Sequence, residues 1–163
     1  MASKKGVYER LLDLQSQKAV KFISFSCHAD GETAKRAIED FDFDCCMIQL
    51  NAAGTGKFES VALPAALKKN MGILAMKSTA QGQLLANGPE GRLKKLLNYV
   101  WALPVSSIVL GIKTPEMLTQ NIAFSRKIES PEESELIMLR NELADARSYL
   151  DHYFRNHSDF IQA

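Results

Sequence analysis

The stretch Cys45 to Phe58, CCMIQLNAAGTGKF, places an apolar run before a loop that contains two glycines. The run, Cys45 to Leu50, has the length and composition of a buried strand. Beyond the loop, residues 61–69 have helical character, and we expect Pro64 in the first turn of that helix. A buried strand, a loop and a helix make one β-α unit, which indicates an α/β fold.

The loop itself, NAAGTGKF, partly matches a nucleotide phosphate-binding loop. That motif needs glycine at its first position, where backbone amides wrap a phosphate, and Ser or Thr after its lysine to bind magnesium. Asn51 and Phe58 occupy these two positions. We therefore interpret the loop as a strand-to-helix connection and not as the loop of a nucleotide hydrolase.

The β-α unit recurs on both sides of this stretch. Asp30 is the predicted N-cap of one helix, and Thr114-Pro115 begins another with its proline at the first position. Consecutive β-α units predict a parallel sheet whose strands are apolar on both faces, because helices cover them. The predicted strands are residues 19–25, 45–50, 72–76 and 107–111, and the predicted helices are residues 6–17, 31–40, 61–69, 92–103 and a segment from 114.

A C-terminal amphipathic helix is predicted over residues 130–156. Ser130-Pro131-Glu132-Glu133 reads as a capping box at its start. We interpret its apolar stripe as a packing face, with a partner-binding helix as the alternative. The stripe consists of Leu136, Leu139, Leu143, Ala146, Leu150 and Tyr153.

Composition excludes several classes of protein. The 163 residues suit a single domain, and the net charge of +1 predicts neither a nucleic-acid partner nor attraction to an anionic membrane. No apolar run is long enough to span a bilayer, so we expect a cytoplasmic location. Cys27, Cys45 and Cys46 lack paired ligand spacing, and we expect no disulfide framework and no metal site.

Polar residues follow each predicted strand. Four strands with right-handed crossovers can form a small open sheet or half of an eight-stranded barrel, and in both folds the functional site lies at the strand C-terminal ends. Hydroxyl, amide and lysine side chains dominate there, which favours binding of an amide or a phosphate over bond cleavage. These residues are 26–30, Gln49, Asn51, 76–78 and 111–114.

Three segments resemble the aldo-keto reductase family. They are VKFISFSCH at 20–28, GILAMK at 72–77 and the long match YVWALPVSSIVLGIKTPEMLTQN at 99–121. The resemblance covers only the C-terminal half of that family's barrel, strands five to eight. It implies half of a TIM-type (β/α)8 barrel over residues 6–128, with about four parallel β-α units followed by the C-terminal helix, all within one domain, 1–163.

The family reduces carbonyl compounds with hydride from NADPH. Its catalytic Asp, Tyr, Lys and His lie on the first four strands, which have no counterpart here, so the resemblance implies no catalytic residue in this chain. Tyr8, Tyr99, Tyr149 and Tyr153 all fall in predicted helices, away from the strand ends where a general acid is needed. We expect the isolated chain to be inactive toward a small carbonyl substrate.

The resemblance also implies most of an NADP(H) site. Ser26 and Gln49 would contact the nicotinamide carboxamide, and Met76 stands where many members stack an aromatic ring on the nicotinamide. Lys113 and Thr114 would hold the adenosine 2′-phosphate, and a cation beside a helix N-terminus also suits an anion on physical grounds.

Two neighbouring positions depart from the family's pattern. Asn121 would meet the adenine, but Met117 replaces a frequent phosphate-binding arginine and Gln120 often corresponds to an acid. We therefore expect weak or residual NADP binding.

Simpler interpretations remain for these residues. Ser26 could satisfy backbone groups at a strand end, Lys113 could be a solvated cation, and Gln49 could fill polar space in a barrel. The alternative function is a catalytically inert half-barrel that binds a small ligand or self-associates. In either case we expect a homo-oligomer, or a second chain that supplies the missing half-barrel, because half a barrel leaves two sheet edges unpaired.

Overall fold

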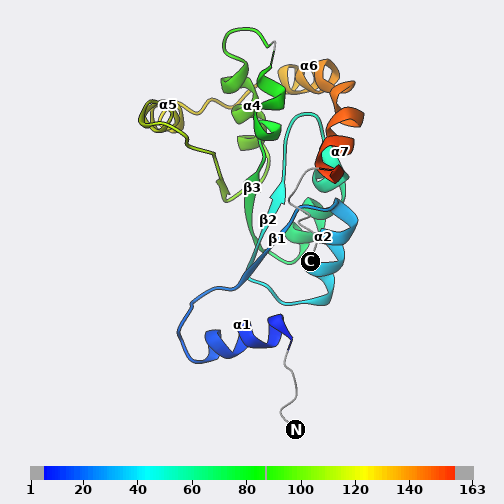
Figure 1. Ribbon diagram of the computed structural model, residues 1–163, viewed down its shortest axis with the longest axis vertical. Helices are drawn as coiled ribbons and strands as arrows, with labels where there is room; N and C mark the ends of the chain where they lie inside the picture. Colours follow the sequence, from blue (N-terminus) through cyan, green and yellow to red (C-terminus); the bar gives the residue numbers. More distant parts are fainter. Residues whose placement is uncertain (1–5, 87, 157–163) are drawn as a thin grey trace.

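The computed structural model describes residues 6–86 and 88–156 (Figure 1). Its strands are β1 (Ser24–Cys27), β2 (Cys45–Gln49), β3 (Gly72–Met76) and β4 (Ser107–Ile108). Its α-helices are α1 (Val7–Ser16), α2 (Gly31–Asp40), α3 (Leu63–Lys68), α4 (Arg92–Trp101), α5 (Pro115–Ser125), α6 (Glu133–Leu143) and α7 (Ala146–Asn156). Short helical turns η1 (Thr55–Lys57), η2 (Phe58–Ala62) and η3 (Ala80–Leu85) lie in the connections.

The described strands form one parallel sheet in the order β1-β2-β3-β4. Neighbours in sequence are therefore neighbours in space, and each is joined to the next through a helical crossover, as in a barrel. The predicted α/β fold with consecutive parallel β-α units is confirmed. The predicted capping of α2 is also confirmed, because the Thr33 amide donates to the Asp30 carboxylate at 2.7 Å.

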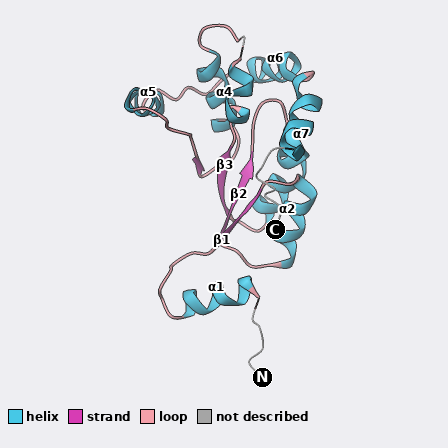
Figure 2. Ribbon diagram, viewed as in Figure 1, coloured by secondary structure: helices cyan, strands magenta, loops and turns pink. Residues whose placement is uncertain are grey.

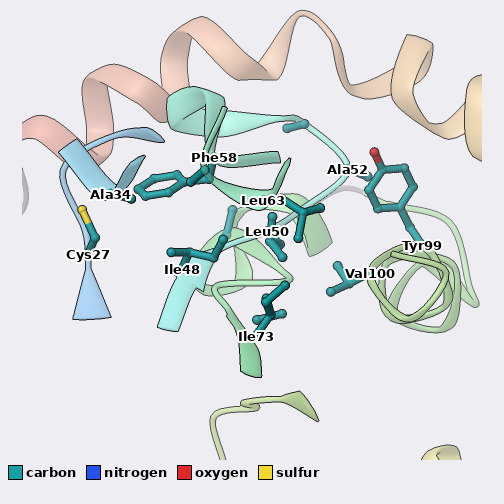
Figure 3. Close-up of a cluster of buried hydrophobic side chains, with 14 of the residues drawn as sticks. Cys27, Ala34, Ile48, Leu50, Ala52, Phe58, Leu63, Ile73, Tyr99 and Val100 are labelled. Carbon is teal, nitrogen blue, oxygen red and sulfur yellow. The ribbon is translucent and has the colours of Figure 1, made fainter. Parts of the chain in front are cut away.

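The hydrophobic core lies on one face of the sheet. Side chains alternate along each strand, and Cys46, Ile48 and Ile73 point to the core while Met47 and Leu74 do not. Figure 3 shows Ile48 and Ile73 near Leu63 of α3, within the same cluster of buried side chains. The opposite face, which would line the inside of a closed barrel, carries only half-buried residues near its middle.

Two strands are shorter than predicted by more than one residue. β1 begins at Ser24 and not at residue 19, because residues 18–22 first close the end of α1: the Ala19 amide donates to the Leu14 carbonyl. β4 ends at Ile108, and only one further ladder bond follows, from the Val109 amide to the Ala75 carbonyl. β3 ends one residue after Ala75, at Met76, because Lys77 adopts a left-handed conformation (φ 54°) that turns the chain away from β4.

The single C-terminal helix expected over 130–156 is two helices. α6 ends at Leu143 and α7 begins at Ala146, with tighter i to i−3 backbone bonds at Ala144 and Arg147 between them. The capping box is also shifted: it joins Glu132 and Glu135 and not Ser130 and Glu133. The break redirects the stripe, so that α7 reaches the loop after β2 (Figure 2).

Two helices contribute nothing to the core. No residue of α1 or α5 is buried, and Figure 1 shows α5 standing apart from the other helices. α1 packs below the sheet through Tyr8, whose ring lies 4.8 Å from that of Phe41 and 5.0 Å from that of Phe43. Within the described ranges, no helix is both long and apolar enough to cross a bilayer.

Candidate functional site

Gln49 and Met76, predicted to face the nicotinamide, lie side by side. Each is the last residue of its strand, and the parallel register pairs them directly. Both are almost fully buried, Gln49 with 2% and Met76 with 6% of its surface exposed. The structure therefore brings these two residues together but leaves little of them open to a ligand.

The amide of Gln49 already has a partner inside the protein. Its Nε2 donates to the Thr55 hydroxyl, and Asn51 Nδ2 donates to the same oxygen at 2.8 Å. Asn51 Oδ1 and Ser78 Oγ, both buried close to these strand ends, have no hydrogen-bond partner. The polar groups at this end thus hold the 51–57 loop against the sheet, while two of their oxygen atoms accept no hydrogen bond.

Helix α7 covers this end of the sheet. The Gly56 amide donates to the Asp151 carboxylate at 2.8 Å, and the Lys77 ammonium lies 4.6 Å from the centre of the Phe154 ring. Leu150 and Phe154 are buried in the core. The loop NAAGTGKF therefore does offer a backbone amide to an anion, but that anion is a side chain of the same protein.

The space left beneath α7 is small. A cavity of about 30 Å³ lies among His28, Gln49, Phe58, Asp151 and Phe154. It has room for a water molecule, whereas ligand pockets occupy roughly 300 Å³ or more. A nicotinamide ring cannot bind beside Gln49 while α7 holds this position.

Ser26 lies outside this covered region. It sits on β1 with an exposed side chain on the barrel-interior face, and its register partner is Met47 and not Gln49. The structure therefore does not place Ser26 level with Gln49, the residue with which it was predicted to share the carboxamide.

The predicted phosphate end lies at the start of α5. Thr114 is the N-cap, and its hydroxyl accepts a hydrogen bond from the Met117 amide at 3.3 Å, with Pro115 in the first turn. Lys113 precedes the cap and is exposed, while Asn121 is half-buried more than a turn further along. Lys113, Thr114 and Asn121 therefore lie on one helix and its entry, as the sequence predicted.

Glu116, in the first turn of α5, was missed by the sequence reasoning. The Thr114 hydroxyl and then its own backbone amide donate to its carboxylate, which lowers the pKa of Glu116 below its usual value. A carboxylate at a helix N-terminus competes with any phosphate for the same free amides. The available signal was an acidic residue directly after Thr114-Pro115, in the first turn of the predicted helix.

Tyr99 is the tyrosine most deeply engaged in the core. Its hydroxyl donates to both carboxylate oxygens of Glu59, at 2.9 and 3.1 Å, and Arg140 pairs with the same carboxylate. Burial, together with the Glu59 charge, raises the pKa of Tyr99 well above its usual value. Such a hydroxyl fixes α4 against η2 and α6, and it does not reach a strand end where a general acid is needed.

The described residues offer no other obvious chemistry. Among them, no group of three or more His, Cys, Asp or Glu side chains is arranged to hold a metal ion. Burial raises the pKa of the Cys46 thiol to about 12, so this cysteine stays protonated and unreactive near neutral pH.

Comparisons with known proteins identify the architecture. No family model and no curated protein matches the sequence. Among solved structures, the aldo-keto reductase AKR11C1 from Bacillus halodurans is similar in its holo form (TM-score 0.65, 16% identity) and its apo form (TM-score 0.66, 12% identity). Each comparison covers 84% of this chain, and 55% and 56% of those chains, so this chain spans about half their length. The protein therefore has the fold of about half of an aldo-keto reductase barrel.

Proposed function

We propose that this chain is the cofactor-binding half of an NADP(H)-dependent carbonyl oxidoreductase of the aldo-keto reductase type. The observation that carries the proposal is the start of α5, where Lys113 and Thr114 lie exposed at a helix N-terminus on half of such a barrel. Catalysis then requires the other half-barrel, and the chain alone binds cofactor without reducing a carbonyl compound. A small carbonyl substrate and a cytoplasmic location accompany this function.

The residues fit the phosphate end of NADP(H) better than its nicotinamide end. The first amides of α5 and the Lys113 ammonium can converge on a 2′-phosphate, which NADH lacks. Met117, 36% exposed in the same turn, adds no charge, and Glu116 competes for the amides. We therefore expect a modest preference for NADPH.

The nicotinamide end supports a second candidate function. Because α7 closes the strand ends above Gln49, a resident nicotinamide has no place in this conformation. This favours a catalytically inert half-barrel that binds a different small ligand or self-associates. The two candidates differ in whether the chain recognises the 2′-phosphate.

Fluorescence titrations with NADPH and NADH test the proposal. We expect NADPH to bind about 5- to 30-fold more tightly, as for one partly exposed charged hydrogen bond of ~1–2 kcal/mol. Lys113→Ala should abolish this preference and leave NADH affinity unchanged, while Met117→Arg should strengthen NADPH binding.

A lysine on another element provides the matched control. Lys68 is exposed at the end of α3, which leads into the start of β3, whereas α5 follows the end of β4, so Lys68→Ala should leave both affinities unchanged. Equal affinities for the two cofactors, or no binding of either at millimolar concentration, would favour the inert half-barrel.

A further inference from the structure

One continuous side of the molecule is uncovered. It comprises the barrel-interior face of the sheet, the outer edges of β1 and β4, and the segment through α5. Its apolar side chains are exposed: Phe22 by 62%, Ile112 by 52%, and Val109, Leu118 and Ile122 each by 43%. We call this side the open surface, and it consists of residues 22, 24, 26, 45, 47, 72, 74, 107, 109–112 and 117–122.

The open surface has the size of a stable interface. It contains about twenty residues, and specific dimers bury ~800 Å² and 20–30 residues on each partner. Exposed apolar patches of this extent on soluble proteins mark interaction sites. The edges of the sheet also favour pairing with further strands, because β1 and β4 each have a neighbouring strand on one side only.

The geometry points to a second copy of this chain as the occupant: we propose that two copies pair through their open surfaces, β1 of each beside β4 of the other, to close an eight-stranded parallel barrel. A two-fold axis along the barrel relates the copies, so both junctions are identical. Both edges carry parallel strands of the same direction, as closure of a barrel requires.

The position of α1 leaves the gap beside β1 without a helix from the same copy. In a barrel, one helix covers each gap between neighbouring strands. In a continuous barrel, the helix that precedes β1 would cover the gap beside β1. Instead, α1 is held below the sheet, by the Tyr8 contacts with Phe41 and Phe43 and by a 2.9 Å hydrogen bond from Gln15 to Asp44.

The gap beside β1 is therefore free for a helix of the partner. In the symmetric dimer that helix is the partner copy's α5, which has exposed Leu118 and Ile122 and no buried residue of its own. Each copy supplies its α5 to one junction, while α1 stays below the sheet. The dimer therefore gives the uncovered α5 of the monomer a packing position without moving α1.

The proposal does not rest on cofactor binding, so its failure would be distinct from failure of cofactor recognition. A barrel closed by two copies leaves no edge for a catalytic half-barrel, so this dimer binds cofactor without reducing a carbonyl compound. Light scattering after gel filtration should give twice the chain mass of 18.1 kDa over a range of micromolar concentrations. Leu118→Glu should weaken the dimer by at least about tenfold, because it places a charge in an apolar interface. Met138→Glu is the matched control, since Met138 is 63% exposed on α6, outside the open surface, and should leave the mass unchanged.

A second variant tests strand pairing. The Ile23 carbonyl accepts from the Cys45 amide, so the next residue, Ser24, directs its own amide to the outer edge. Ser24→Pro removes that donor without breaking a bond to β2, and it should also give a monomer with an unchanged circular dichroism spectrum. A monomer at every concentration, a dimer unaffected by both variants, or association only with a separate polypeptide carrying the complementary half-barrel would overturn the proposal.

Discussion

Replacement of Asp151 by alanine should increase the affinity for NADPH. The Asp151 carboxylate accepts a hydrogen bond from the Gly56 amide at 2.8 Å, and its side chain is 26% exposed. A hydrogen bond to a charged group contributes about 1.5–3 kcal/mol. If α7 must leave the strand ends before the nicotinamide can bind, a loss of ~2 kcal/mol of docking energy raises the apparent affinity by up to about 30-fold.

The experiment combines fluorescence titration with hydrogen exchange. Exchange at the Gly56 amide reports whether α7 has left, and the titration reports whether departure opens the cofactor site. Asp151→Asn removes the same charge but keeps an acceptor, so it separates repulsion of the cofactor from docking of the helix. Phe154→Ala weakens docking without a charge change and should act in the same direction as Asp151→Ala.

A further variant controls for any effect of reduced overall stability on NADPH affinity. Ile38→Val lies on α2, at a fully buried position away from α7, and should cost about 0.5–1.5 kcal/mol without changing NADPH affinity. Faster exchange at Gly56 in Asp151→Ala, accompanied by unchanged or weaker NADPH binding, would refute the reasoning. In that case α7 does not obstruct the cofactor.

Three further predictions concern single positions. Gly31→Ala places a Cβ 2.5 Å from the Lys57 carbonyl oxygen and should lower the free energy of unfolding in urea by about 1–3 kcal/mol. Gly6→Ala, whose Cβ would meet no atom within 4 Å, should leave that free energy unchanged. Equal stabilities of the two variants would contradict this prediction. Burial in the folded state raises the pKa of Cys46 from 9.0 to about 12, so the folded protein keeps the thiol proton at pH values where the unfolded chain loses it. The free energy of unfolding should therefore fall as pH rises above 9, by up to ~1.4 kcal/mol per pH unit. Cys46→Ala should flatten that slope in urea titrations at alkaline pH. Glu116→Gln should raise NADPH affinity about two- to fivefold by freeing the first amides of α5, and an unchanged dissociation constant would place the phosphate elsewhere.

Local sequence signals located most elements of the fold. The residues of β3 and the caps at Asp30 and Thr114 follow from strand composition and from side chains that satisfy helix N-terminal amides, both of which depend on neighbours in sequence. The extent of β4 was wrong because a strand ends where its neighbour turns away, as Lys77 does after β3. The start of β1 was wrong because residues 18–22 close the end of α1 before the strand begins. That is a property of two segments together, and one strand's sequence does not contain it.

The candidate site also has a part that the sequence predicted and a part that it did not. Lys113 and Thr114 were placed correctly relative to α5 because they adjoin it in sequence. The covering of Gln49 by α7 was not foreseen, since it depends on a contact between Gly56 and Asp151, 95 residues apart. The apolar stripe predicted that this helix packs against another element, but hydrophobic periodicity does not identify that element.

Phosphorus NMR of NADP⁺ bound to the protein tests the central claim most directly, because it observes the 2′-phosphate itself. A phosphate monoester has a second pKa of about 6, and a neighbouring ammonium group stabilises its dianion. We predict that the pKa of the 2′-phosphate falls on binding and that Lys113→Ala returns it to the value of the free cofactor. A 2′-phosphate whose pKa is the same in the presence and absence of the protein would contradict the account.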